Sequence, residues 1–151
     1  MKPRVLVTGS EGLIGQILCR GLAANYEVFG LDVKASDKPR HHTIDIFNFE
    51  GLTSTLRALR PTYLLHFAAS VRALDDWDDN LRSNIIGTRN VYAAAAEAGI
   101  KRIVYASSNQ VVKGREAECP DGFAIPISAE PCPTTYYACS KLFGETIARR
   151  H

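Results

Sequence analysis

Short apolar runs and longer amphipathic segments alternate along the chain. Residues 4–8 form an apolar, β-branched run that ends at Gly9, and residues 12–24 carry leucines and isoleucines at helical spacing. The first pattern is typical of a strand buried on both faces of a parallel sheet, and the second is typical of a covering helix. The same patterns predict further strands at residues 27–31, 43–46, 63–67 and 102–106, and further helices at residues 52–59, 78–98 and 135–150.

Breaker residues separate these segments. Pro61 stops the helix at 52–59, Gly99 follows the helix at 78–98, and the proline-containing segment 113–133 is predicted to be a loop. Alternating strands and helices imply right-handed crossovers between parallel strands. The sequence therefore predicts an α/β fold with a doubly wound parallel sheet.

Length and charge narrow the class. The chain has 151 residues, of which 46% are hydrophobic and 23% charged, as in an ordinary globular domain. Lys and Arg number 18 against 16 Asp and Glu, and the basic residues are scattered rather than clustered. This distribution argues against nucleic acid as a partner. We expect one domain covering residues 1–151.

The cysteines and the N-terminal sequence indicate the cellular compartment. Cys19, Cys119, Cys132 and Cys139 show neither zinc-site nor disulfide-framework spacing, which favours a reducing cytoplasm. The first apolar run breaks at Gly9, too early for a signal peptide or a membrane span. We expect a cytoplasmic protein that does not interact with membranes.

Three glycines, Gly9, Gly12 and Gly15, lie where the first strand meets the first helix. Glycines at such a junction permit a tight turn, close approach of a pyrophosphate, and close packing of helix on sheet, while free N–H groups at the helix start face the anion. Glu11 would lie near two phosphates, so its carboxylate must point outward. The alternative interpretation is a tight turn without a ligand.

Asp32 ends the second predicted strand, 17 residues after Gly15. A carboxylate there accepts hydrogen bonds from the ribose hydroxyls of a dinucleotide and repels a 2′-phosphate, which favours NAD over NADP. Lys34 and Arg40 follow closely and weaken that preference. An aspartate that merely terminates a strand is the alternative.

Together these residues resemble a known family. The motifs are Thr8-Gly9-x-x-Gly12-x-x-Gly15, Asp32, Asp45-Ile46, His66-Phe67-Ala68-Ala69, Asn84, Ser107-Ser108 and Tyr137-x-x-x-Lys141. They are similar, in this order, to the N-terminal part of the extended short-chain dehydrogenases/reductases, the NAD-dependent epimerase/dehydratase family. The resemblance implies a Rossmann fold that binds NAD through the glycine turn, including Leu13 and Ile14. It also implies that Asp45 and Ile46 hold the adenine, that Phe67, Ala68 and Ala69 line the cofactor, and that Asn84 anchors the long helix and takes part in a proton relay.

Tyr137 and Lys141 are the candidate catalytic pair. Four helical steps place them about 40° apart on one face, whereas Tyr136 would lie about 140° from Lys141. A tyrosine is a poor base at neutral pH, and a nearby ammonium group stabilises its phenolate. Ser108, with Ser107 as the fallback, would bind the same substrate oxygen. The alternative is an amphipathic helix with a snorkelling lysine.

The substrate is less specified. The Ser-Ser-Asn segment, with His66-Phe67-Ala68-Ala69-Ser70-Val71 and Asn84-Ile85-Ile86-Gly87, is similar to the uronate dehydrogenase branch, but Gln110 stands where that branch has histidine. The resemblance implies a sugar or nucleotide-sugar substrate and a homodimer. Uronate oxidation competes with nucleotide-sugar epimerisation or dehydration. A catalytically incomplete NAD-binding module or sensor is the alternative class.

Two further expectations concern metals and the C-terminus. The carboxylates at Asp75, Asp76, Asp78 and Asp79 complement a helix start, and His41-His42 lacks partner ligands, so no metal site is predicted.

Only five predicted strands precede the end of the chain, against six in a complete dinucleotide-binding sheet. We expect a truncation after the catalytic helix, with the C-terminal substrate-binding region absent.

Overall fold

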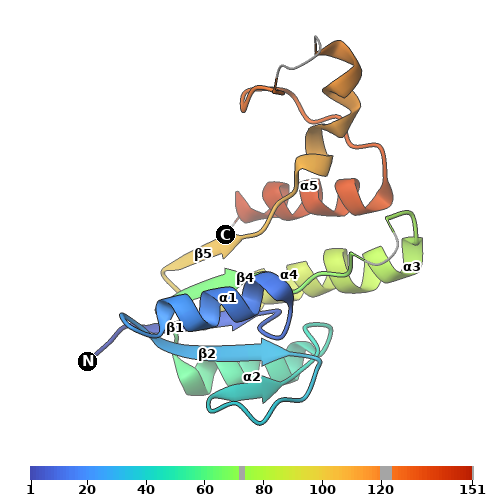
Figure 1. Cartoon of the computed structure of the whole chain (residues 1–151). Helices are drawn as coiled ribbons and strands as arrows, with labels where there is room; N and C mark the ends of the chain where they lie inside the picture. Colours follow the sequence, from blue (N-terminus) through green and yellow to red (C-terminus); the bar gives the residue numbers. More distant parts are fainter. Residues whose placement is uncertain (72–73, 120–123, 151) are drawn as a thin grey trace.

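Five strands form one parallel sheet in the computed structural model, which describes residues 1–71, 74–119 and 124–150 (Figure 1). The strands are β1 (Arg4–Thr8), β2 (Glu27–Asp32), β3 (His41–Thr43), β4 (Tyr63–His66) and β5 (Arg102–Tyr105). Their order is β3-β2-β1-β4-β5, and every neighbouring pair is parallel. The predicted α/β fold with a parallel, doubly wound sheet is confirmed.

Helical segments connect the strands. They are α1 (Leu13–Leu22), α2 (Phe49–Leu59), α3 (Trp77–Asp79), the π-helix η1 (Asn80–Ile86), α4 (Gly87–Glu97), the 3₁₀-helix η2 (Asn109–Glu118) and α5 (Tyr136–Ala148). Asn48 caps α2 by accepting the Gly51 N–H at 3.0 Å, and Thr135 caps α5 by accepting the Ala138 N–H at 3.1 Å. These caps set where the two helices begin.

The main hydrophobic core lies between the sheet and the pair α2 and α4, which contact each other. Its buried members are Leu6, Phe29, Leu31, Ile46, Leu52, Leu56, Leu64, Val91, Ala94 and Ala95. α1 packs against β1 and β2, and α5 contacts both η1 and α4. In Figure 1 the segment drawn in orange, which includes η2, stands away from the sheet beyond α5.

Three sequence-based predictions need correction. The strand predicted at 43–46 is wrong, because β3 occupies His41–Thr43 and Asp45 turns the chain by accepting the Phe47 N–H at 2.9 Å. The helix predicted at 78–98 is interrupted by the π-helix η1. Residues 109–118 are 3₁₀-helical, so the loop at 113–133 begins later than predicted, and residues 120–123 of that loop lie outside the described residues.

Candidate functional site

A cavity of about 540 Å³ lies where β1, β2 and β4 end. In open parallel sheets ligands bind beyond the carboxyl ends of the strands, where the strand order reverses. Here that point is β1, since β2 lies on one side of it and β4 on the other. The predicted cofactor residues that line the cavity are Gly9, Gly12, Asp32, Asp45, Ile46, Phe67, Ala68 and Ala69.

Two glycines of the turn meet steric requirements that no other residue satisfies. Gly9 has φ +73°, and a Cβ there would lie 2.7 Å from the Ala68 nitrogen. A Cβ on Gly15 would lie 2.0 Å from the Gly9 carbonyl oxygen. Both glycines therefore bring the start of α1 and the loop after β4 against the same turn.

Leu13 and Ile14 begin α1 and offer backbone N–H groups rather than side chains at the glycine turn. They occupy the first turn of α1, and their side chains are 82% and 55% exposed. N–H groups in the first turn of a helix have no partner within the helix, so they can bind an anion. Neither residue is among those lining the cavity, and their predicted contact with the cofactor remains a prediction.

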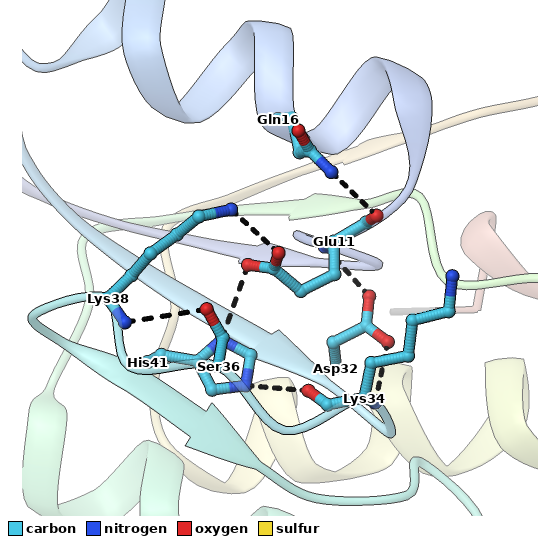
Figure 2. A network of polar contacts seen from close by, with 7 residues as sticks. All are labelled: Glu11, Gln16, Asp32, Lys34, Ser36, Lys38 and His41. Atoms are coloured by element: carbon cyan, nitrogen blue, oxygen red, sulfur yellow. Dashed lines mark hydrogen bonds and ion pairs between the residues drawn. The ribbon is translucent and has the colours of Figure 1, made fainter.

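The Asp32 carboxylate is fixed by the backbone (Figure 2). Its oxygens accept N–H bonds from Glu11 at 2.9 Å and from Lys34 at 3.0 Å, and the residue is only 8% exposed. A carboxylate has about four lone-pair sites, so capacity for ribose hydroxyls remains. The Glu11 carboxylate points away from the turn, toward Lys38, as the sequence analysis requires.

Asp45 belongs to a cluster that the sequence analysis missed. Arg82 in η1 donates to the Asp45 carboxylate at 2.6 Å, and its guanidinium lies 4.6 Å from the centroid of the Phe47 ring. Arg82 lines the cavity beside Asp45 and Ile46. No local signal could reveal this contact, because Arg82 and Asp45 lie far apart in the sequence and meet only through the fold.

Asn84 holds the loop after β4. Its amide oxygen accepts the Ser70 N–H at 2.8 Å, and its amide nitrogen donates to the Ser70 carbonyl at 2.9 Å and to Asn80 at 2.8 Å. The Ser140 hydroxyl of α5 lies 3.5 Å from the same Asn80 oxygen. Asn84 thus joins a lining residue of the cavity to the helix that carries Tyr137, and the structure supports the anchoring part of its predicted role.

Tyr137 and Lys141 lie together on the buried face of α5. Tyr137 is 9% exposed and Lys141 4%, and the Lys141 ammonium lies 5.6 Å from the Tyr137 ring centroid. It donates to the Ala106 carbonyl, just beyond β5, at 3.0 Å, and burial lowers the pKa of Lys141 to about 8. Tyr136, in contrast, is 48% exposed and its ring packs against Trp77. The two tyrosines therefore have the distinct environments that the helical spacing predicts.

The two serines after β5 make different contacts. The Ser107 hydroxyl donates to the Glu145 carboxylate of α5. The Ser108 hydroxyl accepts the Gln110 N–H at 3.2 Å, which caps η2. Neither serine, nor Asn84, Tyr137 or Lys141, lines the 540 Å³ cavity. The catalytic assignment of Ser108 therefore remains a prediction.

His66 has a structural environment. Its ring shares hydrogen bonds with the Thr8 hydroxyl at 2.8 Å and the Thr88 hydroxyl at 3.1 Å. Burial, together with the charge of Lys141, lowers the pKa of His66 to about 3. The ring is therefore neutral at physiological pH and links the end of β1 to α4.

The acidic segment before η1 is used for backbone contacts. Asp76 accepts the Asp79 N–H at 2.9 Å, Asp75 accepts the Tyr136 N–H at 3.3 Å, and Asp79 accepts the Ser70 hydroxyl. In residues 1–71, 74–119 and 124–150, no group of three His, Cys, Asp or Glu side chains is placed to hold a metal ion. Nor does that part of the chain contain a helix long and apolar enough to cross a bilayer.

Comparison with known proteins identifies the family. The profile of the NAD dependent epimerase/dehydratase family matches residues 5–151. The chain belongs to this family. It is 31% identical to L-arabinose 1-dehydrogenase (NAD(P)(+)) of Haloferax volcanii, over 95% of this chain and 59% of that protein. It is 30% identical to uronate dehydrogenase of Pseudomonas putida, over 96% of this chain and 54% of that protein.

A solved structure of the family shows the same fold. UDP-glucose 4-epimerase of Thermus thermophilus, crystallised as a complex with NAD, superposes with a TM-score of 0.85 at 30% identity and covers 97% of this chain. The match covers 50% of the epimerase chain. The chain therefore spans about half the length of the family members it matches.

Proposed function

We propose that this chain is the NAD-binding domain of a dehydrogenase or epimerase that acts on a sugar hydroxyl. The observation that carries the proposal is the Asp32 carboxylate, held by two backbone N–H groups at the edge of the cavity. This arrangement accepts hydrogen bonds from a ribose and opposes a 2′-phosphate. The NAD complex of the similar epimerase supports the same assignment.

The residues of the cavity fit a dinucleotide. Gly9 and Gly15 leave no room for side chains at the turn where a pyrophosphate would approach the N–H groups of Leu13 and Ile14. Asp45 and Ile46 would hold the adenine, now with Arg82, and Phe67, Ala68 and Ala69 would line the rest of the cofactor. All of these residues line the same 540 Å³ cavity, which supports these roles. When bound, the nicotinamide supplies the hydride chemistry.

The proton transfer is assigned to Tyr137. Its hydroxyl would exchange a proton with the substrate oxygen, while the Lys141 ammonium stabilises the phenolate form. Ser108 would orient the same oxygen, and Asn84 would complete a proton relay. In the whole protein, Tyr137→Phe is expected to lower turnover by about 10² to 10⁴ with little change in NAD binding, and Tyr136→Phe is the matched control. Equal turnover losses in the two variants would contradict the assignment.

For the substrate we propose a free sugar or uronic acid oxidised at C1. Two similar proteins, the arabinose and uronate dehydrogenases, support it, while the similarity to a UDP-glucose epimerase keeps a nucleotide-linked sugar as the second candidate. NADH formation with aldoses and uronates, compared with epimerisation of UDP-sugars, separates the two. A cytoplasmic, homodimeric protein is part of the proposal; the four free cysteines support the reducing compartment.

Calorimetric titration of the chain with NAD and NADP tests the cofactor. We expect saturable NAD binding, even if weak, and NADP binding at least about tenfold weaker, which corresponds to about 1.4 kcal/mol. Asp32→Ala should abolish the preference. A clear preference of the wild-type chain for NADP would contradict the proposed role of Asp32. NAD binding by the whole protein without turnover of any sugar would favour a binding module instead.

A further inference from the structure

A charged cluster of Glu11, Lys38 and His41 lies beside Asp32 (Figure 2), and none of the three lines the cofactor cavity. The Lys38 ammonium donates to the Glu11 carboxylate at 2.6 Å, and His41 Nδ1 lies 3.7 Å from the other Glu11 oxygen. The Glu11 carboxylate is only 13% exposed, although Lys38 is 55% exposed. These three residues line a second cavity of about 390 Å³, between α1 and the loop that precedes β3.

We propose that the Glu11–Lys38 ion pair is a second determinant of cofactor choice, which keeps the Lys38 ammonium from binding a 2′-phosphate. The inference rests on the proposed function and extends it. The Asp32 carboxylate alone would repel a 2′-phosphate, but a free Lys38 ammonium nearby would attract it and offset that repulsion. Because the Lys38 ammonium is paired with the Glu11 carboxylate, its charge is not available to the phosphate.

The connection between Glu11 and Asp32 places the pair next to the ribose site. The Glu11 N–H donates directly to Asp32 Oδ2, so the backbone of Glu11 borders the carboxylate that would hold the ribose hydroxyls. Gln16 secures the same residue by donating to the Glu11 carbonyl at 3.0 Å. A phosphate is larger than a hydroxyl, so a 2′-phosphate beside Asp32 would come near the residues that border this carboxylate, Glu11 among them.

The charges around this point balance. Asp32 and Glu11 are negative, Lys34 and Lys38 are positive, and His41 faces Glu11. Arg40, the other basic residue of the loop, lies 3.6 Å from Glu27 and 6.0 Å from the Phe29 ring centroid. Neutralising Glu11 would leave one uncompensated positive charge beside the ribose site.

A hydroxyl group is also available on this side. Ser10 is 2% exposed and lines the second cavity, and its hydroxyl has no hydrogen-bond partner in the described part of the chain. A buried hydroxyl without a partner is unusual. The Ser10 hydroxyl would be a second hydrogen-bond donor for a phosphate, beside the Lys38 ammonium that now pairs with Glu11.

The test uses Glu11→Gln, with Glu97→Gln as the matched control. Glu97 is also the glutamate of an ion pair, with Arg57 at 2.9 Å, but it lies at the end of α4 and lines neither cavity. The probes are 2′-AMP and 5′-AMP, which carry the same charge and differ in the position of the phosphate. Their dissociation constants are measured by calorimetry on the whole chain at low salt.

We expect Glu11→Gln to tighten 2′-AMP binding at least about fivefold, to leave 5′-AMP within about twofold, and to narrow the NAD preference over NADP. Adding Lys38→Met to Glu11→Gln should remove the gain, and Lys38→Met alone should not improve 2′-AMP binding. An equal effect of Glu11→Gln and Glu97→Gln on 2′-AMP binding, or equal gains for both nucleotides, would overturn this inference but leave the proposed function standing. Failure of the wild-type chain to bind NAD would overturn the proposed function as well.

Discussion

Burying the Lys141 ammonium between the rings of Tyr105 and Tyr137 opposes folding. The ammonium lies 5.1 Å from the Tyr105 ring centroid and donates a hydrogen bond to the Ala106 carbonyl. Burial without a paired carboxylate disfavours the charged form, as the pKa lowered from 10.5 to about 8 reflects. Residues retained at such a cost are often functional.

Lys141→Met should therefore stabilise the chain. The lowered pKa corresponds to a destabilisation of about 3 kcal/mol that the variant removes. The variant also loses the hydrogen bond to the Ala106 carbonyl, which costs about 1 kcal/mol. The free energy of unfolding should therefore rise by about 2 kcal/mol at pH 7. The native state releases its proton near pH 8 and the unfolded state near 10.5. Wild-type stability thus gains with pH in that window, and the advantage of the variant should shrink there.

Chemical denaturation at pH 7 and pH 9.5 measures this effect. Lys101→Met removes an exposed lysine and should change stability by less than about 0.5 kcal/mol. A destabilised Lys141→Met variant, or an advantage that grows with pH, would show that the ammonium is well solvated or paired.

The helix α1 contains a matched pair of glycines. Gly15→Ala would place a methyl group 2.0 Å from the Gly9 carbonyl oxygen, whereas nothing lies within 4 Å of a Cβ at Gly21. We expect Gly15→Ala to lower the free energy of unfolding by about 3 kcal/mol and to abolish NAD binding. Gly21→Ala should raise stability by about 0.5 kcal/mol. Thermal unfolding and NAD titration of both variants check this, and similar behaviour of the two would refute the steric argument.

At the scale of elements, the interruption of a long helix places the polar groups. The segment from Trp77 to Glu97 passes from α-helix to π-helix and back, and η1 carries both Asn84 and Arg82. π-helical segments frequently occur at functional sites. Here the segment turns Asn84 toward the loop after β4 and Arg82 toward Asp45, so one element reaches two parts of the cavity wall.

Asn84→Ala tests this element. The change leaves the Ser70 N–H and carbonyl without the Asn84 amide, and we expect a loss of about 2 to 3 kcal/mol in the free energy of unfolding. NAD binding should also weaken, because Ser70 lines the cavity. Asn25→Ala, at an exposed turn, should stay within about 0.5 kcal/mol. An unchanged Asn84→Ala protein would exclude the anchoring role.

Element types followed from local pattern, but element details did not. The strands ending near Thr8 and Asp32 are apolar runs with clear stops, and Tyr137 and Lys141 share a face because helical geometry requires it. The contact of Arg82 with Asp45 depends on tertiary packing, which periodicity does not encode. The π-helix also escaped prediction, since its sequence has the apolar spacing of an ordinary helix.

At the scale of the whole molecule, the sheet has two unequal borders. β3 is short, whereas β5 ends the other side of the sheet in the residues described here, and Val104 on it is 47% exposed. An edge strand with exposed apolar side chains presents unpaired backbone groups that favour association. Within the residues described here, β5 is therefore the edge strand that exposes a large apolar side chain.

We expect the 151-residue chain, taken on its own, to self-associate through β5. Light scattering after gel filtration should show a mass that rises with concentration, and Val104→Lys should reduce this association because a charge opposes edge pairing. Ile127→Lys, at a fully exposed apolar residue outside the sheet, is the control and should have little effect. A monodisperse monomer at all concentrations would contradict the prediction.

The central position of β1 has a consequence for synthesis. β1 is made before β2 and β4, yet it pairs with β2 on one edge and with β4 on the other. On the ribosome its second edge stays bare while residues 33–62 are added, which takes about two to six seconds at ordinary elongation rates. During that interval the nascent chain exposes the middle of its future sheet. Chaperone binding to the nascent chain is expected to be strongest before Tyr63 emerges and to fall once β4 can dock.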